Sequence, residues 1–264
     1  MNFGKALLNW LGRYIEKSSS EKQILRLIKK LNPVRTSSQL IRLGDKYDGG
    51  YLLPDDLEGV KYCFSAGVGN LIKFEKDCLV KYKIKSFLCD FNNIKNPKII
   101  DYFDFTRKKI SSYNSKETIT INNWIDKKIP RNKKDIILKV DIEGSELEVL
   151  LNLSEKHLQK TRFLIVEFHN LRELRNKSFY QIFNNTVSRL LNFFYIVHLH
   201  PNNAGENNKI HNLNVPDFLE VTFARKDRIK NIKKYNSVLP LKIDRRNVEN
   251  KKDILLDSYW YRAN

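Results

Sequence analysis

The sequence has no apolar run long enough to cross a membrane. Such a span needs about 20 consecutive apolar residues, and the segment FGKALLNWLGRYI near the amino end is shorter and interrupted by polar residues. The small-residue cleavage pattern of a secretory signal is absent as well. From these absences we expect a cytoplasmic protein. Its 264 residues favour one principal domain with smaller appendages.

Cysteine is scarce too. The three cysteines, Cys63, Cys78 and Cys89, stand singly in apolar stretches, and none belongs to a C-x-x-C pair. This spacing does not favour a disulfide framework or a cysteine-based zinc site. We therefore expect reduced and buried thiols.

Acidic residues are outnumbered by basic ones, 30 against 48, which gives a formal net charge of +18. Such an excess would ordinarily suggest a polyanionic partner. The lysines, however, are scattered, and no RRM, KH or zinc-finger signature accompanies them. The sequence therefore argues against a nucleic-acid partner and indicates a solvated basic surface.

The amino-terminal segment has the pattern of an amphipathic helix. In SSSEKQILRLIKKLNP, Ser20 is placed to cap a helix that Pro33 ends. The apolar stripe of this helix consists of Ile24, Leu27, Ile28 and Leu31. Such a stripe indicates packing against the body of the protein, and a membrane-surface role for Trp10 and Leu11 is the alternative. The expected organisation is a helical segment at 1–40, a main domain at 41–227 and a basic extension at 228–264.

Short apolar runs separated by helix-length spacers follow. The expected strands are 61–66, 84–90, 117–123, 135–141 and 162–168. Runs that are apolar on both faces predict a parallel sheet covered by helices on each side. Two later runs, 192–200 and 217–225, are joined by the loop 201–216 without an evident helix. This last pair is therefore expected to be antiparallel.

A glycine turn follows the first expected strand in Ser65-Ala66-Gly67-Val68-Gly69. The second strand ends at Asp90, 21 residues after Gly69, close to the spacing of about 20 expected for an acid that binds ribose hydroxyls. The third glycine of a dinucleotide motif is replaced by Ile72. This departure favours a nucleoside ligand without phosphates, such as S-adenosylmethionine.

Carboxylates and imidazoles stand at the ends of later strands. Asp141 and Glu143 follow the fourth strand, and Glu167 and His169 share one face at the end of the fifth. We expect these four side chains to converge beside the ligand crevice. The pair His198 and His200 repeats the same-face spacing near the end of another strand.

This cluster predicts chemistry at a hydroxyl group. His169 or His198 could act as general base. Alternatively, Asp141, Glu167 and a histidine, His169 or His198, could hold Mg²⁺ or Mn²⁺ and lower the pKa of the hydroxyl. The sequence leaves both possibilities open.

Seven segments in this order resemble the FkbM-type family of class I S-adenosylmethionine-dependent methyltransferases, over about residues 40–226. They are IRLGDKYDGGYLLP, FSAGVGNLIKFE, FLCDFN, LKVDIEGSELEVL, FLIVEFHNL, HLHPNN and PDFLEVTFARKD. The resemblance implies a Rossmann-like α/β fold with a seven-stranded, mostly parallel sheet of order 3-2-1-4-5-7-6. Its seventh strand would be antiparallel.

The resemblance also implies a set of cofactor-binding residues. Gly67 and Gly69 would form the turn on the methionine side, Asp90 would bind the ribose, and Glu75 would support the turn. The set is completed by Asp48, Gly49, Gly50 and Tyr51, which match the family's DGGY segment, and by Ser65 and Asp141. Lys73 departs from the serine that the family often has in the first turn.

Family members are mostly linked to O-methylation of sugars and natural products. We therefore expect methyl transfer to a sugar hydroxyl, in a nucleotide-activated hexose or heptose of surface-polysaccharide biosynthesis. The asparagine-rich loop 201–216 is expected to contact the acceptor. The alternatives are an RNA or protein methyltransferase that uses the basic surface, and a binding module without turnover.

Overall fold

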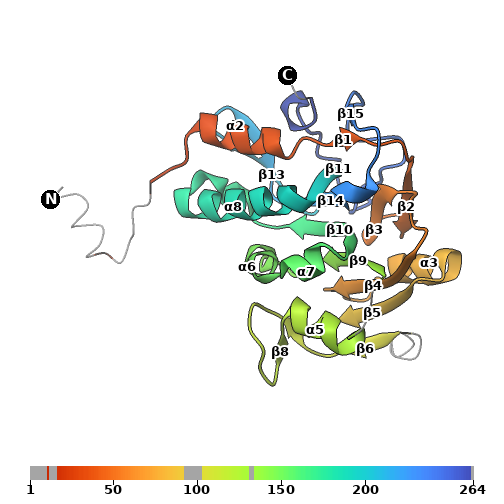
Figure 1. Cartoon of the computed structure of the whole chain (residues 1–264). Coiled ribbons are helices and arrows are strands. Elements are labelled where there is room, and N and C mark those ends of the chain that lie inside the picture. Colours follow the sequence, from red (N-terminus) through yellow and green to blue (C-terminus); the bar gives the residue numbers. More distant parts are fainter. Residues whose placement is uncertain (1–10, 12–16, 92–102, 131–133, 263–264) are drawn as a thin grey trace.

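A computed structural model gives the fold of the chain and describes residue 11 and residues 17–91, 103–130 and 134–262 (Figure 1). The expectation of a helix before residue 17, with the proposed membrane contact of Trp10, lies outside the described residues. None of the described helices combines the length and the apolar character that crossing a bilayer requires.

A seven-stranded sheet forms the centre of the molecule. In chain order its strands are β4 (Val60–Ala66), β5 (Lys85–Cys89), β6 (Asp104–Thr106), β9 (Asp135–Val140), β10 (Thr161–Phe168), β11 (Phe194–Pro201) and β14 (Leu219–Arg225). Their spatial order is β6-β5-β4-β9-β10-β14-β11, which is 3-2-1-4-5-7-6 in chain order. Strand β14 is antiparallel to both of its neighbours, and the other pairs are parallel. The predicted topology is confirmed.

Apolar side chains alternate between the two faces of the sheet, as expected for strands buried on both sides. One layer contains Leu138 and Leu164 and packs against the helices α5 (Ile121–Lys128), α6 (Glu146–Asn152) and α8 (Lys177–Phe193). The other contains Ile137 and Ile165 and packs against α3 (Lys73–Tyr82) and the hairpin of β2 (Leu40–Gly44) and β3 (Gly50–Pro54). Figure 1 shows these two groups of elements on opposite sides of the sheet. Cys63, Cys78 and Cys89 are buried free thiols, as predicted.

The prediction of a sheet strand over 117–123 is wrong. Only β8 (Thr118–Ile119) is extended there, and it pairs with β7 (Lys109–Ile110) in a separate two-stranded sheet. Thr120 then accepts a hydrogen bond from the backbone N–H of Asn123 and caps α5, so the apolar residues that follow take helical spacing. The third strand of the main sheet is β6, which has three residues.

The predicted helix near the amino end is confirmed as α2 (Glu21–Lys30). Ser20 and Gln23 form a reciprocal capping box, and the four residues of the predicted stripe are fully buried. Lys30 Nζ donates to Asn184 and Ser188 of α8, each at 2.9 Å. The helix does not continue to residue 40, because Pro33 cannot extend it and β1 (Val34–Arg35) follows.

The carboxy-terminal extension packs against the main domain. Strand β15 (Lys233–Lys234) pairs with β1, and Trp260 is fully buried and donates from Nε1 to the carbonyl of Asn214 at 3.0 Å. The loop 201–216, in which no helix was evident from the sequence, contains the hairpin of β12 (Asn207–Ile210) and β13 (Leu213–Pro216). Contacts of the extension therefore reach residues far earlier in the chain.

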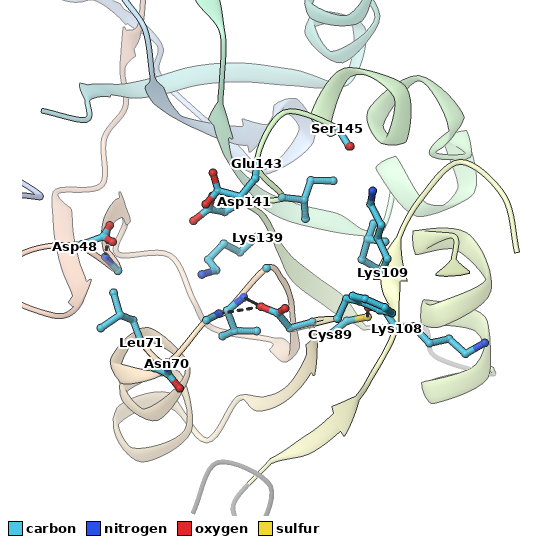
Figure 2. A pocket seen from close by; sticks show the side chains of 18 of the residues that line it. Asp48, Asn70, Leu71, Cys89, Lys108, Lys109, Lys139, Asp141, Glu143 and Ser145 are labelled. Atoms are coloured by element: carbon cyan, nitrogen blue, oxygen red, sulfur yellow. Dashed lines mark hydrogen bonds between the residues drawn. The ribbon is translucent and has the colours of Figure 1, made fainter. Parts of the chain in front are cut away.

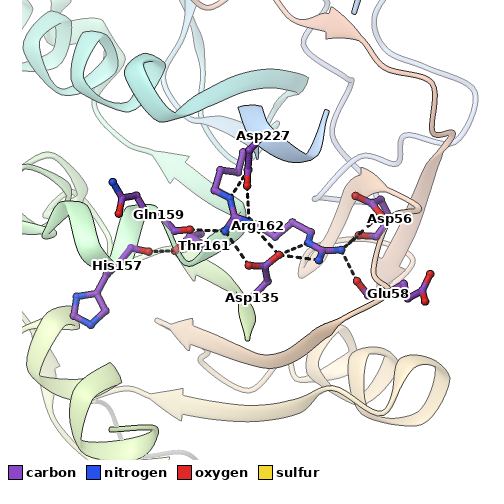
Figure 3. Close-up of polar contacts among 9 residues, drawn as sticks. Asp56, Glu58, Asp135, His157, Gln159, Thr161, Arg162 and Asp227 are labelled. Carbon is purple, nitrogen blue, oxygen red and sulfur yellow. Dashed lines mark hydrogen bonds and ion pairs between the residues drawn. The ribbon is translucent and has the colours of Figure 1, made fainter. Parts of the chain in front are cut away.

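An ion-pair network closes the edge of the sheet at which β9 and β10 begin (Figure 3). Asp135 accepts hydrogen bonds from Arg162 Nε at 2.9 Å and from Arg225 Nη1 at 2.9 Å, and Arg162 also donates to the carbonyls of Asp56 and Glu58. Burial by itself would raise the pKa of Asp135, but the bonds from Arg225 and Arg162 outweigh it and lower the pKa. The network therefore stabilises the edge of the sheet at which these strands begin. The opposite edge, at which they end, is where the sequence places the candidate site residues.

Candidate functional site

A cavity of about 480 Å³ lies at the carboxyl ends of β4, β5 and β9 (Figure 2). Its lining includes eight of the residues singled out from the sequence: Asp48, Gly49, Tyr51, Gly67, Gly69, Asp90, Asp141 and Glu143. This is the edge at which open α/β sheets bind ligands, and the volume is within the range of small-molecule sites. The predicted crevice therefore exists where strand order reverses between β4 and β9.

The two glycines of the turn after β4 have different physical roles. A Cβ on Gly67, which has a φ of +73°, would lie 1.6 Å from the carbonyl oxygen of Asp141, so only glycine fits this approach of two strand ends. Gly69 has a φ of +50°, and no atom lies within 4 Å of where its Cβ would be. Gly67 is thus required for the close packing of the ends of β4 and β9, and Gly69 leaves open space at the cavity.

Asp90 joins the end of β5 to this turn. Its Oδ2 accepts hydrogen bonds from the backbone N–H groups of Val68 and Gly69, both at 2.9 Å. The acid that the spacing singled out is therefore at the cavity and shapes the glycine turn. Its binding to ribose stays a prediction.

Three buried charged or polar groups contact one another near the end of β4. The Ser65 hydroxyl donates to Oε1 of Glu75, which is fully buried, and Lys139 Nζ lies 3.8 Å from the same oxygen. Lys139 also lies over the ring of Tyr51, 5.1 Å from its centroid, and reaches the cavity. Burial would lower the pKa of Lys139, but the charges of Glu75 and Asp141 outweigh it and keep this cation protonated.

The DGGY segment forms another wall of the cavity. Asp48 Oδ1 accepts from the backbone N–H of Gly49 at 2.9 Å. Gly50 begins β3 and does not line the cavity, and a Cβ there would lie 2.3 Å from the carbonyl of Asp45. The hydroxyl of Tyr51 lies 3.5 Å from Oδ2 of Asp141, a weak bond between this wall and the end of β9.

The acids and the histidine after β9 and β10 converge, as expected from the sequence. His169 Nε2 lies 3.4 Å from Oε2 of Glu143 and 3.9 Å from Oε1 of Glu167. Asp141, Glu167 and His169 each offer one atom that could bind a metal ion, and these three atoms lie within 4.8 Å of one another. Asp141 and Glu143 line the cavity, and Glu167 and His169 are buried behind them.

Burial and mutual repulsion perturb these groups. Burial raises the pKa of Asp141 to about 6, even though Lys139 and His169 act in the opposite direction. Burial, with the charges of Asp141 and Glu220, raises the pKa of Glu167 well above its ordinary value. Burial would lower the pKa of His169, but its hydrogen bond to Glu146 and the surrounding carboxylates raise it. Such shifts concentrate at functional sites.

The second histidine pair lies in a different cluster. His198 Nε2 is 2.8 Å from Oδ1 of Asp244, and His200 Nε2 is 3.2 Å from Oδ1 of Asn247. Both partners belong to the carboxy-terminal extension, and neither histidine lines the cavity. The structure therefore does not bring His198 into the Asp141, Glu167 and His169 set, and its role as general base stays a prediction with less support than that of His169.

The residues that sequence reasoning missed include Lys139, Glu146, Glu220 and Asn247. A lysine inside the apolar strand DIILKV was a usable signal for Lys139, because an unpaired charge is rarely buried. Glu146 follows Ser145 at the first helical position of α6, where an acid is ordinary capping chemistry. The contacts of Glu220 and Asn247 depend on how the carboxy-terminal extension packs against the main domain, and no sequence spacing predicts them.

The order of the strands, the glycine turn and the strand-end acid are the features expected of an S-adenosylmethionine-dependent methyltransferase. The family model of the methyltransferase FkbM domain matches residues 3–194, and the chain belongs to this family. No curated protein sequence matches the chain.

Similar solved structures include a fibrillarin/Nop5p complex, with a TM-score of 0.39 and 10% identity over 64% of this chain and 74% of that one. The methyltransferase CalO6 has a TM-score of 0.33 and 10% identity, over 64% of this chain and 58% of its own.

The residues around the cavity fit this cofactor. Gly69 leaves open space beside Asp90, and Asp48 and Asp141 offer carboxylates to a cationic amino-acid end. Lys139, held between Glu75 and the Tyr51 ring, offers a cation to the carboxylate of that same end. Ser65 and Glu75, which were expected to bind the cofactor or support its turn, do not line the cavity and are hydrogen-bonded to each other.

Proposed function

We propose that this methyltransferase transfers a methyl group to a hydroxyl oxygen of a sugar, with the acceptor beside His169. The observation that carries the proposal is the convergence of Asp141, Glu143, Glu167 and His169, of which Asp141 and Glu143 line the cavity and the other two are buried behind them. A hydroxyl is a poor nucleophile until a nearby group takes its proton. An imidazole surrounded by carboxylates can take this proton. The same side chains present no ring on which an aromatic base could stack.

The cofactor supplies an electrophilic methyl group on a sulfonium centre. The protein's contribution is to position the acceptor oxygen and to remove its proton. Oε1 of Glu146 lies 3.1 Å from Nδ1 of His169 and accepts a hydrogen bond from the N–H group at that position. This bond leaves the lone pair of Nε2 facing Glu143 and Glu167, where it can accept the hydroxyl proton.

A divalent cation held by Asp141, Glu167 and His169 is the second way in which the same side chains could activate a hydroxyl. Their ligand-type atoms lie within 4.8 Å of one another. Two carboxylates and one imidazole suit Mg²⁺ or Mn²⁺, and the ion would lower the pKa of the hydroxyl and orient a diol. Asn202 donates to Glu167 Oε1 at 2.8 Å and would orient this ligand.

We extend the proposal to a nucleotide-activated hexose or heptose of surface-polysaccharide biosynthesis. Lys108 and Lys109 line the cavity and would attract the phosphates of such an acceptor. Asn202 and Asn203, at the start of the loop 201–216, are buried and bonded to Glu167 and to the carboxy-terminal extension. The hydroxyl contacts expected of that loop therefore do not come from these two asparagines.

The test is a panel of nucleotide sugars incubated with the protein and S-adenosylmethionine, read by mass for one added methyl group. His169→Ala and Asp141→Asn should abolish turnover. His169→Ala should also leave the dissociation constant of S-adenosylhomocysteine nearly unchanged, because His169 does not line the cavity. His211→Ala is the matched control, because His211 bonds the carbonyl of Ser19 far from the cavity.

A chelator separates the two ways of activating the hydroxyl. Activity that disappears with chelator and returns with Mg²⁺ or Mn²⁺ supports the cation, and resistant activity supports His169 as simple base. Methylation of RNA or protein, with no sugar methylated, would replace this acceptor class. Such activity should fade steeply as salt rises, because many phosphate or acidic contacts are then involved.

A further inference from the structure

A second cluster of metal-ligand side chains lies where the carboxy-terminal extension covers strand β11 at the edge of the sheet. His198 and His200 project from the same face of β11, and Asp244 comes from the extension. Ligand-type atoms of the three lie within 4.8 Å of one another, and the residues are only 3%, 5% and 7% exposed. The cluster is separate from Asp141, Glu167 and His169.

The separations within this cluster suit one small cation. Asp244 Oδ1 lies 2.8 Å from His198 Nε2 and 3.8 Å from His200 Nδ1. Bonds of about 2.0–2.1 Å in a tetrahedron place neighbouring ligand atoms about 3.3 Å apart. Both separations from Asp244 are within about 0.5 Å of this value, and all three ligand-type atoms lie within 4.8 Å of one another.

Two imidazole nitrogens of the cluster, Nδ1 of His198 and Nδ1 of His200, are buried without a hydrogen-bond partner among the described residues. A buried polar atom without a partner costs about 1–3 kcal/mol. For His200 a bound cation would remove this cost, because its Nδ1 is the atom that faces Asp244.

Hydrogen bonds around the cluster already orient two of its ligands. The amide nitrogen of Asn247 donates to Asp48 and to Glu220, so its Oδ1 accepts from Nε2 of His200. This bond places the proton of His200 on Nε2 and leaves the lone pair of Nδ1 toward Asp244. Histidines that bind metals almost always donate their other nitrogen in this way.

The backbone N–H of Leu241 donates to Oδ2 of Asp244 at 2.6 Å. This bond leaves Oδ1 as the oxygen that faces both imidazoles. The carboxylate is therefore held in the orientation that a shared ligand requires.

We propose that His198, His200 and Asp244 bind one Zn²⁺ ion and that this ion fastens the carboxy-terminal extension to the sheet. Two imidazoles and one carboxylate are a typical zinc ligand set and are less suited to Mg²⁺. The ion takes the place of the hydrogen bond between His198 Nε2 and Asp244, and the neutral imidazole of His198 then carries its proton on Nδ1.

The site has a consequence for the cofactor cavity. Asn247 follows Asp244 by three residues and bonds Asp48, which lines the cavity. An ordered extension therefore holds one wall of the cavity in place. The inference does not depend on the acceptor proposed above, because it is tested by metal binding alone.

The experiment uses the full chain, stripped of metal by a chelator and then titrated with Zn²⁺ against a chromophoric competitor. We expect one tightly bound Zn²⁺ per chain, a higher melting temperature with Zn²⁺, and no such shift with Mg²⁺. Asp244→Asn is near-isosteric and retains one oxygen acceptor, for either His198 or the N–H of Leu241, but it loses the anionic ligand. It should weaken Zn²⁺ binding by about 100-fold or more, beyond the 10–100-fold typical of outer-shell changes.

His200→Ala should have an equal or larger effect, and His211→Ala should have none. If His200→Ala does not fold, the near-isosteric Asp244→Asn still decides the question. Absence of stoichiometric Zn²⁺ would overturn the proposal, as would equal affinity in wild type and Asp244→Asn. Loss of the tight site in Asp141→Asn, with Asp244→Asn unaffected, would assign the metal to the other cluster.

Discussion

His169 Nδ1 lies 3.1 Å from Oε1 of Glu146, a carboxylate that is almost completely buried. The same oxygen accepts from the backbone N–H groups of Ile142 and Gly144, at 3.1 and 2.9 Å. One carboxylate therefore fixes the turn that carries Glu143 to the cavity and also orients the imidazole behind it. Glu146 is a positioning residue in this arrangement, because it acts on the acceptor through His169.

Glu146→Gln should lower kcat by about 10²–10⁴, the scale seen when a carboxylate that orients a catalytic imidazole is made neutral. The KM for S-adenosylmethionine should change little. If the imidazole is the base, activity rises with pH as His169 loses its proton. Because Glu146 raises the pKa of His169 against the effect of burial, the acid limb of the profile should move to lower pH in the variant.

Glu148→Gln is the matched control for this change. Glu148 is on the same helix, and its carboxylate contacts Ser112 rather than the site. Steady-state kinetics from pH 5 to 9 measure both variants. An unchanged kcat and an unmoved acid limb in Glu146→Gln would remove His169 from the proposed mechanism.

Asp90→Ala should weaken binding of S-adenosylmethionine and S-adenosylhomocysteine by about 1.5–3 kcal/mol, the scale of a hydrogen bond to a charged group. Part of this loss would come from the turn, since Asp90 holds the N–H groups of Val68 and Gly69. Calorimetric titration measures both ligands. Asp104→Ala, which removes an ion pair with Lys128 and lies outside the cavity lining, is the control. Equal affinity in Asp90→Ala and wild type would show that this carboxylate does not hold the ribose.

The two glycines of the turn should respond differently to alanine. Gly67→Ala should prevent folding, because the new Cβ would lie 1.6 Å from the carbonyl oxygen of Asp141. Gly69→Ala should fold, with a loss of about 1–2 kcal/mol from its left-handed conformation, and should bind the cofactor more weakly because its Cβ enters open space at the cavity. Circular dichroism and calorimetry distinguish these outcomes. Cofactor affinity of Gly69→Ala equal to wild type would place the ligand elsewhere.

Continuous apolar runs of the long buried strands predicted a parallel sheet with an antiparallel last pair, and the resemblance to the FkbM-type family implied the strand order. Asp90, Asp141 and Glu167 were identifiable because acids rarely follow such runs without a reason. The short strand β6 was missed, since three residues with intermediate burial carry no periodic signal. The run at 117–123 was misread, because a capping threonine converts its second half into a helix.

The role of the carboxy-terminal extension was not predictable for a different reason. Residues 241–252 are polar and irregular, and they contact partners such as Asp48 and His200 through single hydrogen bonds. Pairings of this kind span 199 and 47 positions of the chain. Sequence periodicity reports only local structure, so the cluster of His198, His200 and Asp244 emerges only in three dimensions.

Glu220 gives the last prediction, which concerns stability. This side chain is buried on β14, and burial raises the pKa of its carboxyl to about 8, with Asp48 adding to the effect and Asn247 opposing it. The unfolded chain loses the same proton near the ordinary value of 4.5. Between these pH values the folded state binds more protons, so the contribution of Glu220 to the free energy of unfolding falls as pH rises.

Glu220→Gln removes this titration and retains an oxygen that can accept from Asn247. The variant should match wild type near pH 5 and exceed its free energy of unfolding by on the order of 3 kcal/mol near pH 9. Denaturant unfolding at several pH values measures the difference in free energy of unfolding between the variant and wild type. The contributions of the other titrating groups largely cancel in this difference. Glu206→Gln, at an exposed position, should parallel wild type throughout. A constant offset between Glu220→Gln and wild type from pH 5 to 9 would mean that Glu220 is ionised across this range in the folded protein.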